Sequence, residues 1–151
     1  MPRGDPVQPA ARILIVDDEP GIQRIFELAL GNYGFVTVGA LDASMALEKL
    51  DQERFDFIVI DVNMPGHDGV ELVRLLRERG CATPIVLMSG RPLKDGTKRA
   101  LNDEGVRFLM KPVMPSELRG IVQASLALAR NAPTLREPPA SSRRGVGGRL
   151  R

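Results

Sequence analysis

Five polar side chains that could take part in a reaction or bind a ligand follow short apolar runs of this chain. They are Asp17 and Asp18 after residues 13–16, Asp61 after 57–60, Ser89 after 84–88, and Lys111 after 108–110. Short runs rich in β-branched residues, separated by helical segments, are typical of buried parallel strands. The carboxyl ends of such strands share one edge of the sheet, where ligands bind. We therefore expect the five side chains to converge at that edge.

The expected cluster combines three carboxylates with an ammonium group and a hydroxyl group. Three carboxylates in close proximity repel one another, so the cluster either raises a pKa or requires a cation. The added Lys111 and Ser89 suggest that an anion also enters the site. A phosphoryl group carried on a carboxylate satisfies both conditions, and the pattern therefore indicates a phosphorylation site.

The charge of the chain is unevenly distributed. The 151 residues carry a net charge of +2, but residues 131–151 contain five Arg and one Glu and so hold +4. Residues 1–11 balance to zero, which leaves −2 on residues 12–130. The length fits one domain with its own hydrophobic core, and that domain is mildly acidic.

The two ends differ from the middle in composition. Residues 131–151 are rich in Pro, Gly, Ser and Arg, and residues 1–11 contain three Pro. Such segments bury too little apolar surface to fold, so we expect both to be disordered around a domain at 12–130. The chain has no apolar stretch of membrane-span length and no apolar signal-peptide core at its start, and its single Cys81 has no intrachain partner. These features predict a cytoplasmic protein that does not bind membranes.

Strand and helix patterns alternate between residues 12 and 130. We expect strands at about 12–16 and 36–39, and three more that end at Asp61, at Ser89 and just before Lys111. Five βα units of this kind predict an α/β fold, a doubly wound five-stranded parallel sheet with helices on both faces.

The helices are predicted from apolar periodicity and capping residues. The first begins at Pro20, the second is capped by Asp42, the fourth stops near Gly105, and the fifth spans about 115–129. The residues expected to face the sheet are Ile22, Ile25, Phe26 and Ala29 in the first helix, Ala43, Ala46, Leu47 and Leu50 in the second, and Leu72, Leu75 and Leu76 in the third.

Four motifs at characteristic intervals resemble the receiver domains of two-component response regulators, a flavodoxin-like family that includes stand-alone chemotaxis-type regulators. The resemblance covers about residues 12–130. Its motifs are Ile-Val-Asp-Asp-Glu-Pro at 15–20, Asp-Val-Asn-Met-Pro-Gly-His-Asp-Gly at 61–69, Ser89-Gly90, and Lys111-Pro112. The resemblance implies the strand order 2-1-3-4-5 and a cis Lys111-Pro112 bond.

The same resemblance implies a role for each clustered residue. Asp61 would accept a phosphoryl group from a histidine kinase or a histidine phosphotransfer protein. Asp18, Asp61 and the backbone carbonyl of Asn63 would hold Mg²⁺, with Asp17 reaching it directly or through water. Lys111 would pair with a phosphoryl oxygen. The domain would then be a signalling phosphoacceptor that catalyses only its own phosphorylation and dephosphorylation.

Two further residues are implied to report the modification. Ser89 would donate a hydrogen bond to the phosphoryl group, and Phe108 stands where the family has a switch aromatic, although a plain core role fits Phe108 as well. Two departures from the family pattern are also present. Met114 occupies the usual capping position of the last helix, which removes a cap worth ~1 kcal/mol. Asn63 and Arg91, two residues beyond Asp61 and Ser89, occupy positions that modulate dephosphorylation in the family.

We expect a stand-alone receiver, because residues 131–151 are too few and too polar to form an effector domain. Its output would then pass to a partner protein at the face formed by the fourth helix, the fifth strand and the fifth helix. A nucleic-acid role is disfavoured because the Arg-rich tail lacks aromatic residues and the domain is acidic.

Other interpretations of these residues lead to other functions. Considered one at a time, the acidic residues could be loop residues or helix caps. Ser89 could simply end a strand, and Lys111 could be a surface charge. The alternative function is an adaptor of the same fold that is not phosphorylated, but such an adaptor would not need the acidic cluster with Lys111. A haloacid-type phosphatase needs a second Asp where this chain has Glu19, and the acidic 17–19 segment would repel a flavodoxin's flavin phosphate.

Overall fold

Strands and helices alternate through residues 10–64 and 66–130, the part of the chain that the computed structural model describes. The elements are β1 (Arg12–Val16), α1 (Pro20–Gly31), β2 (Val36–Ala40), α2 (Ala43–Gln52), β3 (Phe57–Asp61), β4 (Asn63–Met64), β5 (His67–Asp68), α3 (Gly69–Glu78), β6 (Ile85–Ser89), α4 (Asp95–Asp103), β7 (Val106–Met110) and α5 (Pro115–Arg130). None of the described helices is both long and apolar enough to cross a membrane.

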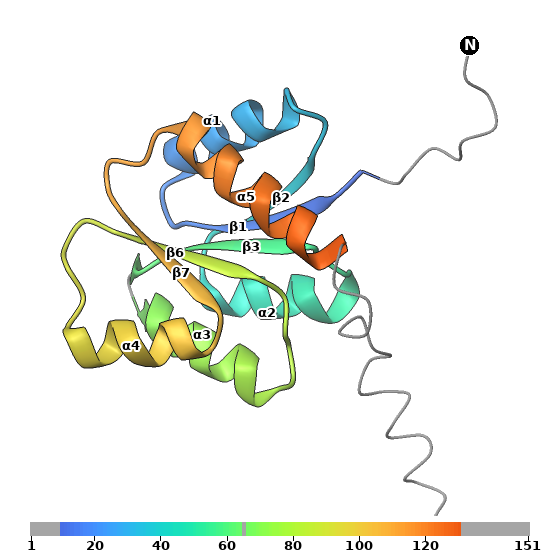
Figure 1. Cartoon of the computed structure of the whole chain (residues 1–151). Helices are drawn as coiled ribbons and strands as arrows, with labels where there is room; N and C mark the ends of the chain where they lie inside the picture. The colour runs from blue at the N-terminus through green and yellow to red at the C-terminus, as the bar shows by residue number, and fades with distance from the viewer. Residues whose placement is uncertain (1–9, 65, 131–151) are drawn as a thin grey trace, which may run out of the picture.

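Five of the strands form one parallel sheet in the order β2-β1-β3-β6-β7 (Figure 1). With β6 and β7 counted as the fourth and fifth strands, this is the predicted order 2-1-3-4-5 and the predicted doubly wound fold. The predicted ends at Asp61 and Ser89 and the helix start at Pro20 are confirmed. The second strand runs one residue further than predicted, because Ala40 pairs with Val16.

Helices cover both faces of the sheet, with α1 and α5 on one face and α2, α3 and α4 on the other (Figure 1). Successive side chains of a strand point to opposite faces of the sheet, so each inner strand contributes side chains to two hydrophobic cores. In β1, Leu14 joins the core under α2, α3 and α4, whereas Ile13 and Ile15 join the core under α1 and α5. Burial on both faces explains why the inner strands are continuous apolar runs rather than alternating ones.

Two helix positions were predicted to face inward but are exposed. Ile25 is 52% exposed and Leu75 is 40% exposed. In α1 the residues that pack on the sheet are Ile22, Phe26 and Leu30, which follow one another every four positions and leave Ile25 to the side. In α3 the buried residues are Leu72, Val73 and Leu76. The apolar stripe of each helix is therefore narrower than its apolar content suggested.

The segment after Asp61 contains the short antiparallel pair β4–β5, which the sequence did not predict. Asn63 pairs with Asp68, and Met64 pairs with His67. Two-residue strands are too short to leave a periodic pattern in the sequence. The disorder predicted for residues 1–11 and 131–151 falls outside the described residues, except at residues 10 and 11.

Candidate functional site

The carboxyl ends of four strands lie together at one edge of the sheet, because parallel pairing aligns them. Asp61 of β3 pairs with Met88 of β6, and Ser89 pairs with Met110 of β7. The pairing continues into the following loop, where the Lys111 amide donates to the Ser89 carbonyl at 2.7 Å. The Lys111-Pro112 peptide is cis, as the resemblance implied.

Three carboxylates form a cluster at this edge. Asp17, Asp18 and Asp61 each offer one oxygen, and these oxygens lie within 4.8 Å of one another. Asp17 and Asp61 are buried, whereas Asp18 is half-buried. A close group of acidic oxygens that is open on one side is a suitable ligand set for a hard divalent cation that retains some of its water.

Asp17 is buried with only one of its two carboxylate oxygens hydrogen-bonded within the described part of the chain. Its Oδ1 accepts a hydrogen bond from the Glu19 amide at 2.9 Å, but its buried Oδ2 has no partner among the described residues. Burial raises the pKa of Asp17 to about 6, and the charges of Asp61 and Asp18 add to the rise, against the opposing Glu19 amide and Lys111. A buried carboxylate oxygen without a donor is a site at which a cation would be stabilised.

The raised pKa of Asp17 predicts a pH-dependent stability for the metal-free domain. The Asp17 carboxyl group binds its proton more tightly in the folded chain than in the unfolded chain. Protonation of Asp17 therefore stabilises the fold below pH 3.8, and this stabilisation is lost as the pH rises to about 6. Asp17→Asn removes this titration. From pH 4 to pH 7 the unfolding free energy of the variant should therefore rise relative to wild type by up to about 2–3 kcal/mol. Urea denaturation of both proteins in EDTA measures this difference, and parallel pH profiles would contradict it.

Asp61 is joined to Lys111 by an ion pair. The Lys111 ammonium donates to Asp61 Oδ1 at 2.9 Å, and the Asn63 amide donates to the same oxygen at 3.3 Å. Burial lowers the pKa of Lys111, but the hydrogen bond and the charge of Asp61, with Asp17 and Glu19, outweigh burial and hold this pKa above its ordinary value. Both recorded partners contact Oδ1, which leaves Oδ2 of Asp61 directed at no donor among the described residues.

Gly69 fixes the backbone behind Asp61, a role that the sequence reasoning missed. A Cβ at Gly69 would lie 2.6 Å from the Asp61 carbonyl oxygen and 2.8 Å from the Val62 Cα, so only glycine lets α3 begin this close to β3. The Gly69 amide donates to the Val62 carbonyl at 2.9 Å, and Asp68 caps α3 through the Val70 amide. The Asp-Gly pair at the end of the 61–69 motif was the available signal.

Ser89 lies at the site edge, but its hydroxyl is bonded to its own loop. Its Oγ donates to the Arg91 carbonyl at 2.7 Å and accepts from the Arg91 amide at 3.1 Å. The side chain is buried. Donation to any group at Asp61 would therefore require the hydroxyl to leave the Arg91 carbonyl.

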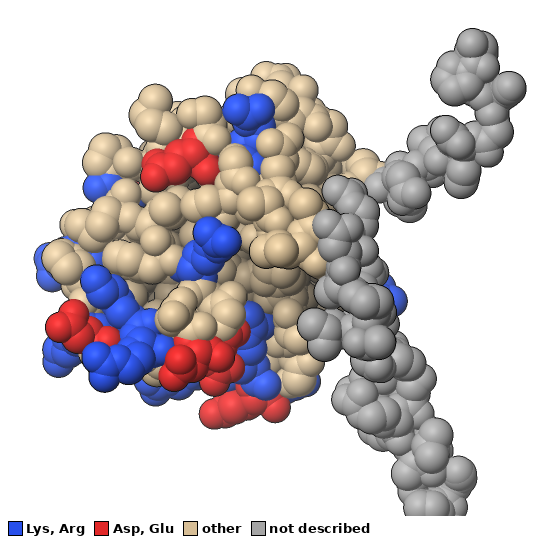
Figure 2. Space-filling view, viewed as in Figure 1, with Lys and Arg blue, Asp and Glu red and all other residues tan. Residues whose placement is uncertain are grey.

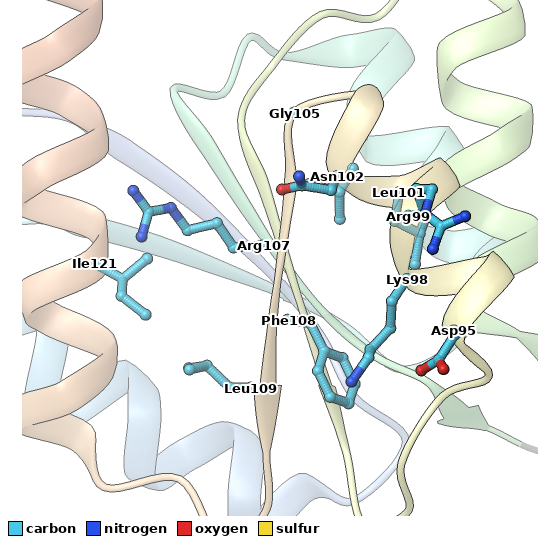
Figure 3. Close-up of a pocket in the computed structure, with 11 residues that line it drawn as sticks. Asp95, Lys98, Arg99, Leu101, Asn102, Gly105, Arg107, Phe108, Leu109 and Ile121 are labelled. Carbon is cyan, nitrogen blue, oxygen red and sulfur yellow. The ribbon is translucent and has the colours of Figure 1, made fainter.

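Phe108 lies away from the acidic cluster, beside a groove of about 760 Å³ between α4 and β7 that extends to Ile121 of α5 (Figure 3). The ring is half-buried and packs against the core on the α4 side, with the Lys98 ammonium 6.0 Å from its centroid. Lys98, Arg99, Arg107 and the single acidic Asp95 also line the groove. Figure 2 shows side chains of both charges gathered at the lower left, where Figure 1 places α4.

The remaining residues singled out from the sequence are not among the three carboxylates of the cluster. Cys81 is a half-buried free cysteine whose sulfur is 3.5 Å from the Thr83 hydroxyl. Arg91 and Met114 are exposed. The side chain of His67 is outside the described part of the structure.

The fold and the acidic sheet edge define a receiver-type domain, and comparison with known proteins identifies the family. The model of the response regulator receiver domain matches residues 13–123, so the chain belongs to this family. The response regulator protein PilR of Pseudomonas aeruginosa is 35% identical over 132 residues, which are 87% of this chain and 29% of PilR.

Solved structures agree with this assignment. The chemotaxis protein CheY4 of Vibrio cholerae is 30% identical, with a TM-score of 0.70 over 78% of this chain and 100% of CheY4. The response regulator TrrA of Thermotoga maritima, solved in complex with Mg²⁺-BeF, is 26% identical, with a TM-score of 0.66 over 77% of this chain and 99% of TrrA. The chain spans only part of the length of such curated relatives, for example 53% of MtrA of Mycolicibacterium smegmatis and 24% of FleR of Pseudomonas aeruginosa.

Proposed function

We propose that this chain is a phosphorylation-dependent receiver in which Asp61 accepts a phosphoryl group from a histidine kinase or a histidine phosphotransfer protein. The observation that carries the proposal is the environment of Asp61. Lys111 and Asn63 both hold Oδ1, and the partnerless carboxylate oxygen of Asp17 lies in the same cluster. A nucleophile beside a cation and a further acidic oxygen is the arrangement that phosphoryl transfer requires.

Mg²⁺ is the cofactor that fits these donors. Asp17, Asp18 and Asp61 supply carboxylate oxygens that lie within 4.8 Å of one another, and the Asn63 backbone carbonyl would complete the protein ligands. When bound, Mg²⁺ neutralises the charge that accumulates on phosphoryl oxygens. The complex of the related TrrA with Mg²⁺-BeF supports the choice of metal.

The transfer step follows from the positions of the two oxygens of Asp61. One carboxylate oxygen attacks the phosphorus of the phosphohistidine, a P–O bond forms, and the P–N bond breaks with its electron pair going to the imidazole. The Lys111 ammonium, 2.9 Å from Oδ1, is close enough to move its hydrogen bond from the carboxylate to a phosphoryl oxygen. The pKa of Lys111 is raised by its contact with Asp61, so its ammonium group is charged when transfer begins.

Labelling with a small phosphodonor tests this function directly. Wild-type protein incubated with Mg²⁺ and acetyl phosphate should gain one alkali-labile phosphoryl group, measured by intact mass. EDTA should prevent the gain, because Asp17, Asp18 and Asp61 then face the donor without a counterion. If the mass stayed unchanged with Mg²⁺ and no kinase of a purified panel transferred a phosphoryl group to the chain, the alternative function would be favoured, an adaptor of the same fold that is not phosphorylated.

Signal output is proposed to run from Ser89 to the groove beside Phe108. Phosphorylation would draw the Ser89 hydroxyl away from the Arg91 carbonyl and free the 89–91 loop, which leads into α4. Phe108 lies on β7 next to α4 and could then pack deeper. A target protein would bind the face of α4, β7 and α5, and the basic lining of the groove favours an acidic segment. The stand-alone arrangement and the cytoplasmic location stay predictions.

Ser89→Ala and Lys111→Ala should separate reporting from transfer. Ser89→Ala should still be phosphorylated at Asp61, but a target's preference for the phosphorylated form should fall by about 1–3 kcal/mol, the usual size of such coupling. Lys111→Ala should impair both labelling and target binding, because the reaction and the switch share its charge. Titration of an identified target against phosphorylated wild type and both variants measures this. Equal binding by wild type and Ser89→Ala would show that the hydroxyl is a bystander.

A further inference from the structure

Gln23 of α1 reaches from its helix to the carboxyl ends of β1 and β2. Its side-chain amide nitrogen, Nε2, lies 3.0 Å from the Ala40 carbonyl oxygen, 3.2 Å from that of Ile15 and 3.5 Å from that of Asp17. The side chain is half-buried. Two N–H groups thus serve carbonyls on both strands at the point where the acidic loop begins.

Gly39 of β2 provides the room for this side chain. A Cβ at position 39 would lie 2.5 Å from both Cδ and Oε1 of Gln23, and 2.8 Å from Oε2 of Glu27. Gly39 does not have a positive φ, so the backbone conformation itself does not call for glycine here. The missing Cβ at position 39 instead leaves space for the ends of two α1 side chains, Gln23 first and Glu27 second.

The contacts of Gln23 converge on the peptide groups of Asp17. The Ala40 carbonyl that accepts from Gln23 also accepts from the Asp17 amide, at 3.0 Å. The Asp17 carbonyl is within reach of the same Gln23 nitrogen. Gln23 thus contacts the Asp17 carbonyl directly and the Asp17 amide only through the shared Ala40 carbonyl, while the Asp17 carboxylate belongs to the cluster with Asp18 and Asp61.

We propose that Gln23 is a positioning residue for the metal site: its amide holds the backbone of Asp17 in place, and Gly39 admits it. The inference rests on the proposed Mg²⁺ site but concerns a residue outside the ligand set. Packing of α1 does not depend on it, because Phe26 and Leu30 are buried against the sheet on the same helix. Loss of the amide should therefore loosen Asp17 more than it loosens the fold.

Gln23→Met tests the proposal, because methionine keeps the length of the side chain and removes its donors. We expect the Mg²⁺ dissociation constant, measured by calorimetry, to rise at least about tenfold, the lower end of the 10–100-fold typical for residues that orient metal ligands. In the metal-free protein the Asp17 amide proton should exchange faster with solvent. Gln123→Met, on the exposed side of α5, is the matched control and should change neither quantity.

Gly39→Ala tests the same contact from the other strand. The added methyl group would displace the Gln23 side chain, so Mg²⁺ affinity should fall as in Gln23→Met. In a Gln23→Ala background only the flexible end of Glu27, 2.8 Å from the added methyl group, has to move, and Gly39→Ala should cause no further loss. Glu27→Ala, which alters the other neighbour of Gly39, should leave the affinity unchanged.

The possible results separate this inference from the proposed function. Wild-type Mg²⁺ affinity in both Gln23→Met and Gly39→Ala, with wild-type exchange of the Asp17 amide, would overturn the positioning role and leave the metal site intact. Failure of the wild-type protein itself to bind Mg²⁺ would overturn the proposed metal site. The amide exchange comparison needs no metal, so it decides the role of Gln23 in that case too.

Discussion

Asp61→Ala is expected to abolish phosphoryl labelling while the domain stays folded. The substitution removes the proposed nucleophile, and the two carboxylates that remain at the sheet edge, Asp17 and Asp18, are proposed metal ligands rather than phosphoacceptors. Stability should change by no more than about 1 kcal/mol, because Lys111 is 30% exposed and can turn to solvent once its partner is gone. Removing one charge also relieves the repulsion on the buried Asp17.

Intact mass after incubation with Mg²⁺ and acetyl phosphate measures the loss, and thermal denaturation checks the fold. Asp103→Ala, at the exposed end of α4, is the matched control and should label like wild type. Labelling of Asp61→Ala at the wild-type level would place the modification on another residue. The roles proposed for Lys111 and Ser89 would then fall as well.

Asp18→Ala is expected to separate metal affinity from stability. The substitution removes a proposed Mg²⁺ ligand, so Mg²⁺ affinity should fall by more than about tenfold, since even outer residues of a metal site commonly account for 10–100-fold. Labelling at limiting Mg²⁺ should fall with it. The metal-free domain should be as stable as wild type or more stable, because Asp18 is one of the charges that disfavour the ionised Asp17.

Calorimetric Mg²⁺ titration and urea denaturation in EDTA give the two quantities for the same protein. Asp95→Ala serves as control, because it removes the same negative charge from a residue that lines the groove and does not belong to the cluster. Normal Mg²⁺-dependent labelling of Asp18→Ala would contradict the ligand assignment. A large loss of metal-free stability would instead indicate that Asp18 supports the loop structurally.

The sequence alone was sufficient to predict the strands of the sheet and the residues of the acidic cluster. The apolar runs before Asp17, Asp61 and Ser89 are buried strands on which helices pack from both sides, and such strands must be apolar at every position. The first polar residue after each run therefore marks a strand end. Because parallel strands align their carboxyl ends, the pattern of apolar runs is enough to place these residues, with Lys111, at one edge of the sheet.

The energetics of the cluster depended on tertiary packing. Asp17 and Asp18 are adjacent and chemically alike, yet only Asp17 is fully buried with an oxygen that has no donor. This difference arises because β1 continues its pairing to Asp17, whose amide bonds to Ala40, while the chain turns outward after it. Pairing of this kind joins residues far apart in the sequence and leaves no local signal.

The direction in which each side chain points, and the partners that it contacts, likewise depended on the tertiary structure. Ser89 was expected at the site and lies there, but only the loop that follows β6 shows that its hydroxyl is bonded to Arg91. Gly39 has no special backbone conformation, so nothing local indicated that it lies against Gln23, and the Asp-Gly pair before α3 did not show how closely Gly69 approaches the Asp61 carbonyl. Periodicity and spacing determine which residues reach the sheet edge, because they set the strands. Contacts between elements then decide which of those residues are buried, paired or left without a partner, because close packing is a property of the whole domain.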